Sequence, residues 1–180
     1  TGFGAIDKAT FQVIVNDFKN ITGVSFLGMV IFLFFYYGKN IKKTLLTVSL
    51  IVVSLLMMMG LTGYLDFTIT VMTMVAAAMI MALGISYGIH AVHGYYTLRS
   101  NHDRDETITH LQSDLLRAFI GSSLTTSAGF LALLFGVLPA MKTLGIVLAM
   151  GILITLVVAV LFLPALLYVL DTSPNSNQHS

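Results

Sequence analysis

Long apolar segments separated by short polar breaks dominate the sequence. Five of these segments are long enough to cross a bilayer, because a helix needs about 20 residues to span a hydrocarbon core of ~30 Å. They cover approximately residues 21–37, 44–64, 67–96, 115–138 and 140–170. The pattern predicts an all-α fold: a polytopic integral membrane helix bundle over residues 21–170, with about five transmembrane helices.

The segments outside these spans are polar. Residues 1–20 are expected to be the end of an extracytoplasmic segment and the lead-in to the first helix. Residues 103–115 carry apolar side chains on one side only, which predicts a short amphipathic helix on the membrane surface. Residues 171–180 are rich in Asn and Ser and are expected to form a disordered tail. Pro139 suits the first turn of the last helix, where its missing N–H costs little.

The composition also favours a membrane protein. Hydrophobic residues make up 57% of the chain and charged residues 9%, whereas a soluble domain typically has about 25% charged residues. The net charge of +1 gives no sign of a nucleic-acid partner. Cysteine is absent and no His or carboxylate cluster accompanies the methionines, so no metal site or cofactor is indicated. No catalytic motif appears, and an enzyme is therefore not expected.

Basic residues predict the orientation of the bundle. Those that follow the first or third span are Lys39, Lys42, Lys43, Arg99, Arg104 and Arg117, and those on the other side are Lys8, Lys19 and Lys142. By the positive-inside rule the first group is cytoplasmic, which places the N-terminus outside and the C-terminus inside. An odd number of spans in this orientation leads us to expect a further span upstream of Thr1.

The third span, within ALGISYGIHAVHGYY, carries polar and titratable side chains. At 100° per residue, Ser86 and His90 share one stripe and Tyr87 lies beside it. Ionisable groups inside a membrane are costly, and imidazole titrates near physiological pH. We therefore expect this stripe to face the bundle interior and to handle protons or a polar substrate group. A structural role is the alternative, because His90 lies near the end of the span and a serine hydroxyl can bond its own helix.

The fourth span, within AFIGSSLTTSAGF, gathers small and hydroxylated residues on one side. In lipid such residues mark close contacts between helices. Ser122 and Gly129 are therefore expected to pack against a neighbouring helix, as are Gly84 and Gly88 of the third span. The hydroxyls of Thr125 and Thr126 are candidates for a proton or water path, together with the three polar residues of the third span.

These motifs resemble the resistance–nodulation–division (RND) superfamily, in particular its hydrophobe-exporter or MMPL-like branch, whose bundle is similar to that of sterol-sensing domains. One family helix reads Gly-Ile-Gly-(Val/Ile)-Asp-Tyr-(Ala/Gly)-Ile-His, the next Ser-Ser-Leu-Thr-Thr-x-x-Gly-Phe, and the last ends in Leu-Pro-Ala-Leu-Leu. Residues 84–90 resemble the first motif, and residues 122–130 and 163–167 match the second and third, in that order.

The resemblance implies half of an RND-type transmembrane domain, helices 8–12 of the second repeat. Such a domain would belong to an exporter of hydrophobic or amphiphilic molecules, lipids among them, in a bacterial or archaeal inner membrane. Its partners would be the missing N-terminal repeat and extracytoplasmic domain, in the same or a separate chain. We also expect contact with membrane lipid and assembly into an oligomer or a larger complex. No nucleic-acid partner is expected.

Ser86 departs from the family pattern, because it stands where the proton-carrying Asp usually lies. Three interpretations remain open. The acid could belong to the other repeat, which would make transport proton-driven through that half and leave Ser86 as a hydrogen-bonding partner. His90 could titrate in place of the acid. Alternatively, the chain could be a non-transporting membrane subunit or a sterol- or lipid-binding module of a larger complex.

Overall fold

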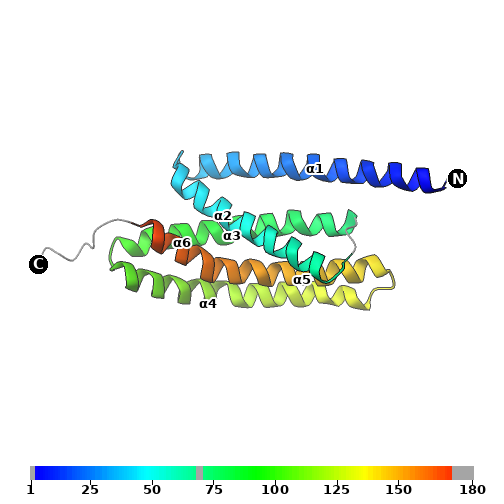
Figure 1. The fold of residues 1–180 in the computed structure, drawn as a ribbon. Coiled ribbons are helices and arrows are strands. Elements are labelled where there is room, and N and C mark those ends of the chain that lie inside the picture. Colours follow the sequence, from blue (N-terminus) through cyan, green and yellow to red (C-terminus); the bar gives the residue numbers. More distant parts are fainter. Residues whose placement is uncertain (1–2, 68–70, 172–180) are drawn as a thin grey trace, which may run out of the picture.

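The computed structural model describes residues 3–67 and 71–171, and every regular element within these ranges is helical (Figure 1). The α-helices are α1 (Phe3–Tyr36), α2 (Ile41–Tyr64), α3 (Val71–Arg99), α4 (Arg104–Leu131), α5 (Pro139–Val157) and α6 (Leu163–Leu170). A 3-10 turn, η1 (Ala132–Phe135), follows α4, and a π-helical turn, η2 (Val158–Phe162), joins α5 to α6.

Five helical stretches are long and apolar enough to cross a membrane. They are Lys19–Tyr36, Ile41–Tyr64, Val75–Arg99, Arg104–Phe135 and Pro139–Leu170. The last stretch combines α5, η2 and α6, which continue one another along the bundle (Figure 1). The prediction of an all-α bundle with five spans is confirmed, and the chain is an integral membrane protein.

The flanking segments differ in part from what the sequence suggested. The amphipathic segment at 103–115 is not a separate surface helix, because α4 begins at Arg104 and continues through the fourth span. Its apolar side, with Leu111 and Leu115, is buried against the bundle and runs on into Phe119. The lead-in over 1–20 is helical from Phe3 onward. The predicted disordered tail lies, from residue 172, outside the described residues.

Helix α3 is central to the packing. It packs most extensively against α2 and α5, and it also contacts α4 and α1. The contact with α2 is close because two glycines face it: a Cβ built at Gly88 would lie 2.5 Å from Cγ2 of Thr47, and one at Gly84 would lie 2.7 Å from Cγ1 of Ile51. Small residues let helix backbones approach in this way, and the close packing gains dispersion energy relative to looser contact with lipid chains. Gly84 and Gly88 thus make the helix contact expected of them.

The two prolines of the last span sit where their missing N–H groups are tolerated. Pro139 is the first residue of α5, as its sequence context indicated. Pro164 lies inside the span and has no N–H to donate to a carbonyl of the preceding turn. The π-helical turn η2 precedes Pro164 and accommodates the missing hydrogen bond. In it, the Leu163 N–H donates to the carbonyl of Val158, five residues back.

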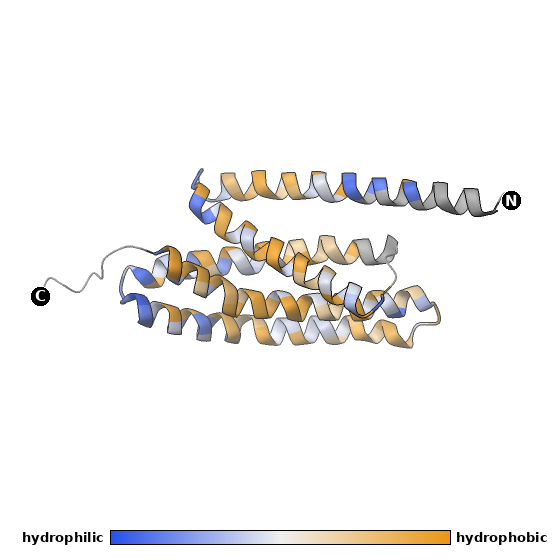
Figure 2. Ribbon diagram, in the orientation of Figure 1, coloured by the Kyte–Doolittle hydropathy of each residue, from blue (hydrophilic) through white to orange (hydrophobic). Residues whose placement is uncertain are grey.

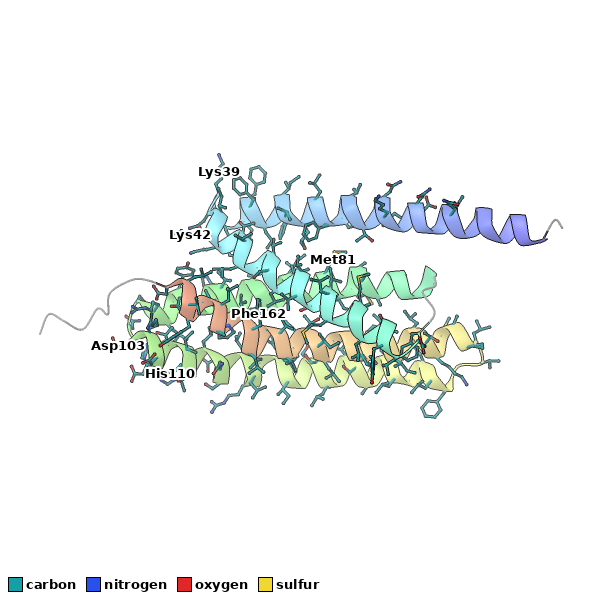
Figure 3. All side chains as sticks on the ribbon, viewed as in Figure 1. Lys39, Lys42, Met81, Asp103, His110 and Phe162 are labelled. Atoms are coloured by element: carbon teal, nitrogen blue, oxygen red, sulfur yellow. The ribbon has the colours of Figure 1, made fainter. Side chains whose placement is uncertain are left out.

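The polar ends of several helices meet at one end of the bundle, which we call the basic end. It holds Lys39, Lys42, Lys43, Arg99 and Arg104, from the α1–α2 turn, the start of α2, the end of α3 and the start of α4. Figure 3 places Lys39, Lys42, Asp103 and His110 at this end. Hydrophilic residues gather there in Figure 2, whereas the spans are mostly hydrophobic.

The glycine contact between α2 and α3 gives a stability prediction. The variant Gly88→Leu forces a side chain into Thr47, which is fully buried, and we expect a loss of about 1–3 kcal/mol from overpacking. Gly60→Leu is the matched control, because among the described residues nothing lies within 4 Å of a Cβ at Gly60. Both variants gain similar helix propensity, about 1 kcal/mol. Thermal unfolding in detergent should show a lower Tm for Gly88→Leu only; equal Tm values would contradict the contact.

Candidate functional site

Helices α3 and α4 meet through an aromatic and hydroxyl contact. The Tyr87 hydroxyl lies 2.7 Å from Oγ of Ser123, and both side chains are buried. The Tyr87 ring stacks on Phe119 with 4.2 Å between centroids, and the His90 ring meets Phe119 edge-on at 5.8 Å. Of the predicted path residues, Tyr87 is therefore the one inside this contact, and its partner Ser123 was not singled out from the sequence.

Ser86 and His90 lie on the outer side of α3, where both are exposed in this chain. The expectation that this stripe faces the interior of the bundle is therefore wrong for the bundle formed by this chain. The reason is that α3 turns its glycines and Tyr87 toward its neighbours. The small polar stripe lies on the side that these contacts leave open.

The candidate residues of α4 also face outward. Ser122, Thr125 and Gly129 are exposed and Thr126 is half-buried. The Thr125 hydroxyl donates to the Gly121 carbonyl at 2.9 Å, and that of Thr126 donates to the Ser122 carbonyl at 2.7 Å. Among the residues that the structure describes, the helix contact expected for Ser122 and Gly129 is not formed.

The buried residues of α4, among them Leu115, Phe119 and Ser123, form a stripe along the helix. The two exposed sides next to this stripe, which we call flanks, differ in composition. One flank carries Ser122, Thr125 and Gly129, and the other carries Leu116, Ile120 and Leu124. Because α3 and α4 run antiparallel and meet through Tyr87 and Phe119, helical rotation puts the first flank on the same side of the bundle as Ser86 and His90. The pale ribbon in the middle of α4 in Figure 2 reflects this weakly hydrophobic composition.

We call this shared surface the polar face. Its members are small or polar: Ala82, Ser86 and His90 of α3, and Ser122, Thr125, Thr126 and Gly129 of α4. Within the described residues, no group of three or more His, Cys, Asp or Glu side chains lies close enough to hold a metal ion. The chemistry that the polar face offers is thus hydrogen bonding by hydroxyl and imidazole groups.

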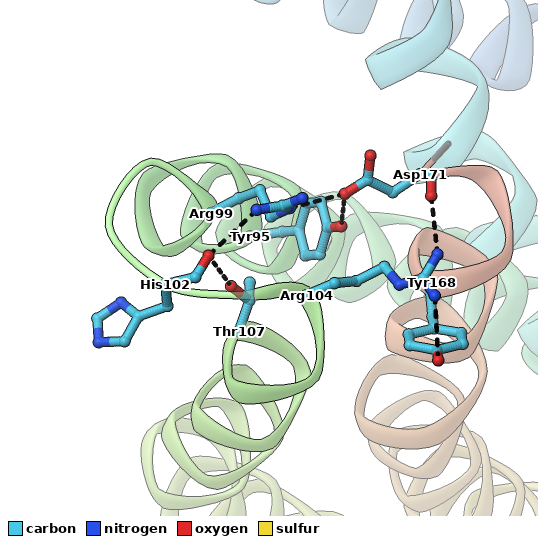
Figure 4. Close-up of polar contacts among 7 residues, drawn as sticks. All are labelled: Tyr95, Arg99, His102, Arg104, Thr107, Tyr168 and Asp171. Atoms are coloured by element: carbon cyan, nitrogen blue, oxygen red, sulfur yellow. Dashed lines mark hydrogen bonds and ion pairs between the residues drawn. The ribbon is translucent and has the colours of Figure 1, made fainter. Parts of the chain in front are cut away.

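A second polar cluster, at the basic end, ties α6 to α3 and α4 (Figure 4). A carboxylate oxygen of Asp171 accepts hydrogen bonds from the Tyr95 hydroxyl at 2.6 Å and from Nε of Arg99 at 2.9 Å. The Arg104 guanidinium donates to the Asp171 carbonyl and the Tyr168 hydroxyl. This cluster could not be predicted from the sequence, where Asp171 reads as the start of a polar tail.

Comparison with known proteins assigns the family. The profile of the MMPL family matches residues 1–179. The chain belongs to the MMPL family. This confirms the resemblance to the MMPL-like branch of the RND superfamily.

Two similar curated proteins are both longer than this chain. It is 32% identical over 170 residues to MJ1562 of Methanocaldococcus jannaschii, which is named as a membrane protein, and the match covers 94% of this chain and 44% of that one. It is 33% identical over 119 residues to MmpL4 of Mycobacterium leprae, named as a probable transport protein, with 66% of this chain and 12% of that one covered. The chain therefore spans less than half the length of these relatives, and it is a membrane protein of the MMPL family.

Proposed function

We propose that this chain is the transmembrane part of an MMPL exporter of hydrophobic or amphiphilic molecules, and that its polar face is covered by another helical repeat. The transport path would then run between the two repeats, along Ser86, His90, Thr125 and Thr126. That second repeat, with its extracytoplasmic domain, would belong to the same or a separate chain.

The observation that carries this proposal is the contrast between the two flanks of α4. Leu116, Ile120 and Leu124 suit contact with acyl chains, whereas the flank with Ser122 and Thr125 does not. Small and hydroxylated residues in membranes are typical of helix–helix interfaces. An imidazole such as that of His90 favours a protein-lined or water-lined surface over lipid.

The proposed proton path takes account of Ser86, which has no ionisable group where the family usually has an Asp. A serine hydroxyl does not titrate in the physiological range, so an acidic residue of the covering repeat would carry the proton. Ser86 would then donate a hydrogen bond to the ionised acid, and the buried Tyr87–Ser123 contact would fix the rotation of α3 that presents it. Hydrogen bonds to charged groups contribute about 1.5–3 kcal/mol.

The basic end is proposed to face the cytoplasm of a bacterial or archaeal inner membrane. Five of the nine Lys and Arg residues of the chain lie in the turns and helix ends gathered there. Basic residues next to spans are retained on the cytoplasmic side. The N-terminus would then be outside and the C-terminus inside.

A pair of adjacent substitutions on α4 tests the role of the polar face. Thr125→Trp puts bulk into the interface with the covering repeat, whereas Leu124→Trp faces lipid, which accommodates it. In inside-out vesicles containing the full-length protein, we measure uptake of a pyrene-labelled fatty acid. We expect Thr125→Trp to lower uptake to the level of protein-free vesicles and Leu124→Trp to retain it. Equal uptake by both variants would remove the polar face from the path.

The same assay separates transport from the rival function. Wild-type uptake should stop when an uncoupler dissipates the proton gradient. A wild-type protein that binds the labelled fatty acid without gradient-dependent uptake would instead be a lipid-binding module or membrane subunit. The serine in place of the family's acid is the feature that favours this second function.

Two further variants locate the proton carrier. Ser86→Ala removes one hydrogen bond to the proposed acid and should slow uptake by about tenfold or more. His90→Gln should keep the pH profile of uptake, because the acid of the covering repeat titrates in its place. His110→Gln, exposed near the basic end, is the matched control. A flat pH profile for His90→Gln alone would instead assign the relay to His90.

A further inference from the structure

A cavity of about 800 Å³ lies at the basic end, between α2, α3 and α6. It is distinct from the polar face: Tyr95, which lines it, follows Ser86 by nine residues and so points to the opposite side of α3. The volume is in the range of small-molecule sites, about 300–1,000 Å³. The cavity is thus large enough for a polar headgroup together with the first part of an acyl chain.

The walls of the cavity that come from α2 and α6 are apolar. Leu45 and Leu46 contribute from α2, and Leu166, Leu167 and Leu170 contribute from α6. Leu45 and Leu170 are 65% and 60% exposed, so the apolar wall continues onto the outer surface of the bundle. An acyl chain could therefore enter from the side without leaving its hydrocarbon surroundings.

The polar rim carries more positive than negative charge. Lys42 and Arg99 line the cavity, and Asp171 is the one acidic side chain among the lining residues. The carboxylate of Asp171 is already paired with Arg99. Beside the rim, the Lys43 ammonium lies 4.2 Å from the centroid of the Tyr96 ring, which adds a further positive charge.

The cavity lies at the level where a lipid headgroup would meet it. Lys42 stands at the start of the span Ile41–Tyr64 and Arg99 at the end of the span Val75–Arg99, so both mark the same membrane–water boundary. Lys and Arg at this level attract anionic lipids and bind phosphate oxygens. The cavity thus has positive charge at the membrane–water boundary and leucine side chains on the hydrocarbon side of it. This arrangement suits an amphiphile with a negative headgroup.

We propose that this cavity binds an anionic phospholipid of the surrounding membrane. The phosphate sits by Lys42 and Arg99, and one acyl chain lies along Leu45, Leu46 and Leu170. The lipid occupies a site on the far side of α3 from the polar face, so it is a resident of the bundle and not the transported molecule. This site does not depend on the proposed export function.

Lipid retention by the purified full-length protein tests the proposal. The protein is incubated in detergent with phosphatidylglycerol or phosphatidylcholine, and bound lipid is measured by native mass spectrometry. We expect wild-type protein to retain phosphatidylglycerol in preference to phosphatidylcholine. Lys42→Gln should weaken this binding about fivefold, the effect of one basic residue near a headgroup. Lys39→Gln, an equal charge change at the same end but outside the cavity, should bind as wild type does.

A second variant tests the acyl chain separately. Leu45→Gln makes the exposed wall polar without emptying the core, and it should also reduce phosphatidylglycerol retention. Free glycerol phosphate distinguishes a soluble anion from a lipid, and we expect it to displace little bound phosphatidylglycerol. Equal retention by Lys42→Gln and wild type would overturn the proposal. So would equal retention of the two lipids, or full displacement by glycerol phosphate.

Discussion

Hydrocarbon offers no hydrogen-bond partners, and this constraint governs the structure of the bundle. Helices satisfy it for the backbone, because each carbonyl and N–H finds a partner within its own segment. Polar side chains must satisfy it individually. Thr125 and Thr126 do so by bonding carbonyls of α4, and Tyr87 does so by pairing with Ser123. The polar face gathers the side chains that a neighbouring protein surface would suit better than lipid.

Helix α3 explains why that face exists. Its glycine side is closed against α2, where Gly84 and Gly88 lie against Ile51 and Thr47. Its tyrosine side is closed against α4 through the Tyr87–Phe119 stack. Ser86 lies on the other side of Tyr87 from the glycines, and that side is left open. The same helix thus serves two purposes, because its packed sides hold the bundle together and its open side is available to a partner.

The sequence predicted the fold well and the site only in part. Span positions follow from the lengths of the apolar runs, and the start of α5 follows from the chemistry of Pro139. Helical periodicity also placed Ser86 and His90 on one stripe. Periodicity gives the angle between residues but not what lies opposite them, so it did not show that the stripe faces outward or that Gly129 is open. The partners of Asp171 could not be predicted, because Tyr95 and Arg99 are distant in sequence and only the fold brings them together.

The central claim is that protein, and not lipid, covers the polar face. Site-directed spin labelling tests it most directly: these 180 residues contain no cysteine, and any cysteines elsewhere in the full-length protein are first replaced by serine. Labels are placed at Ser86→Cys and Leu124→Cys of the full-length protein in liposomes, and their collision rates with dissolved oxygen, which concentrates in hydrocarbon, are compared. A low rate at position 86 and a high rate at position 124 is the predicted result. Equally high rates at both positions would contradict the account.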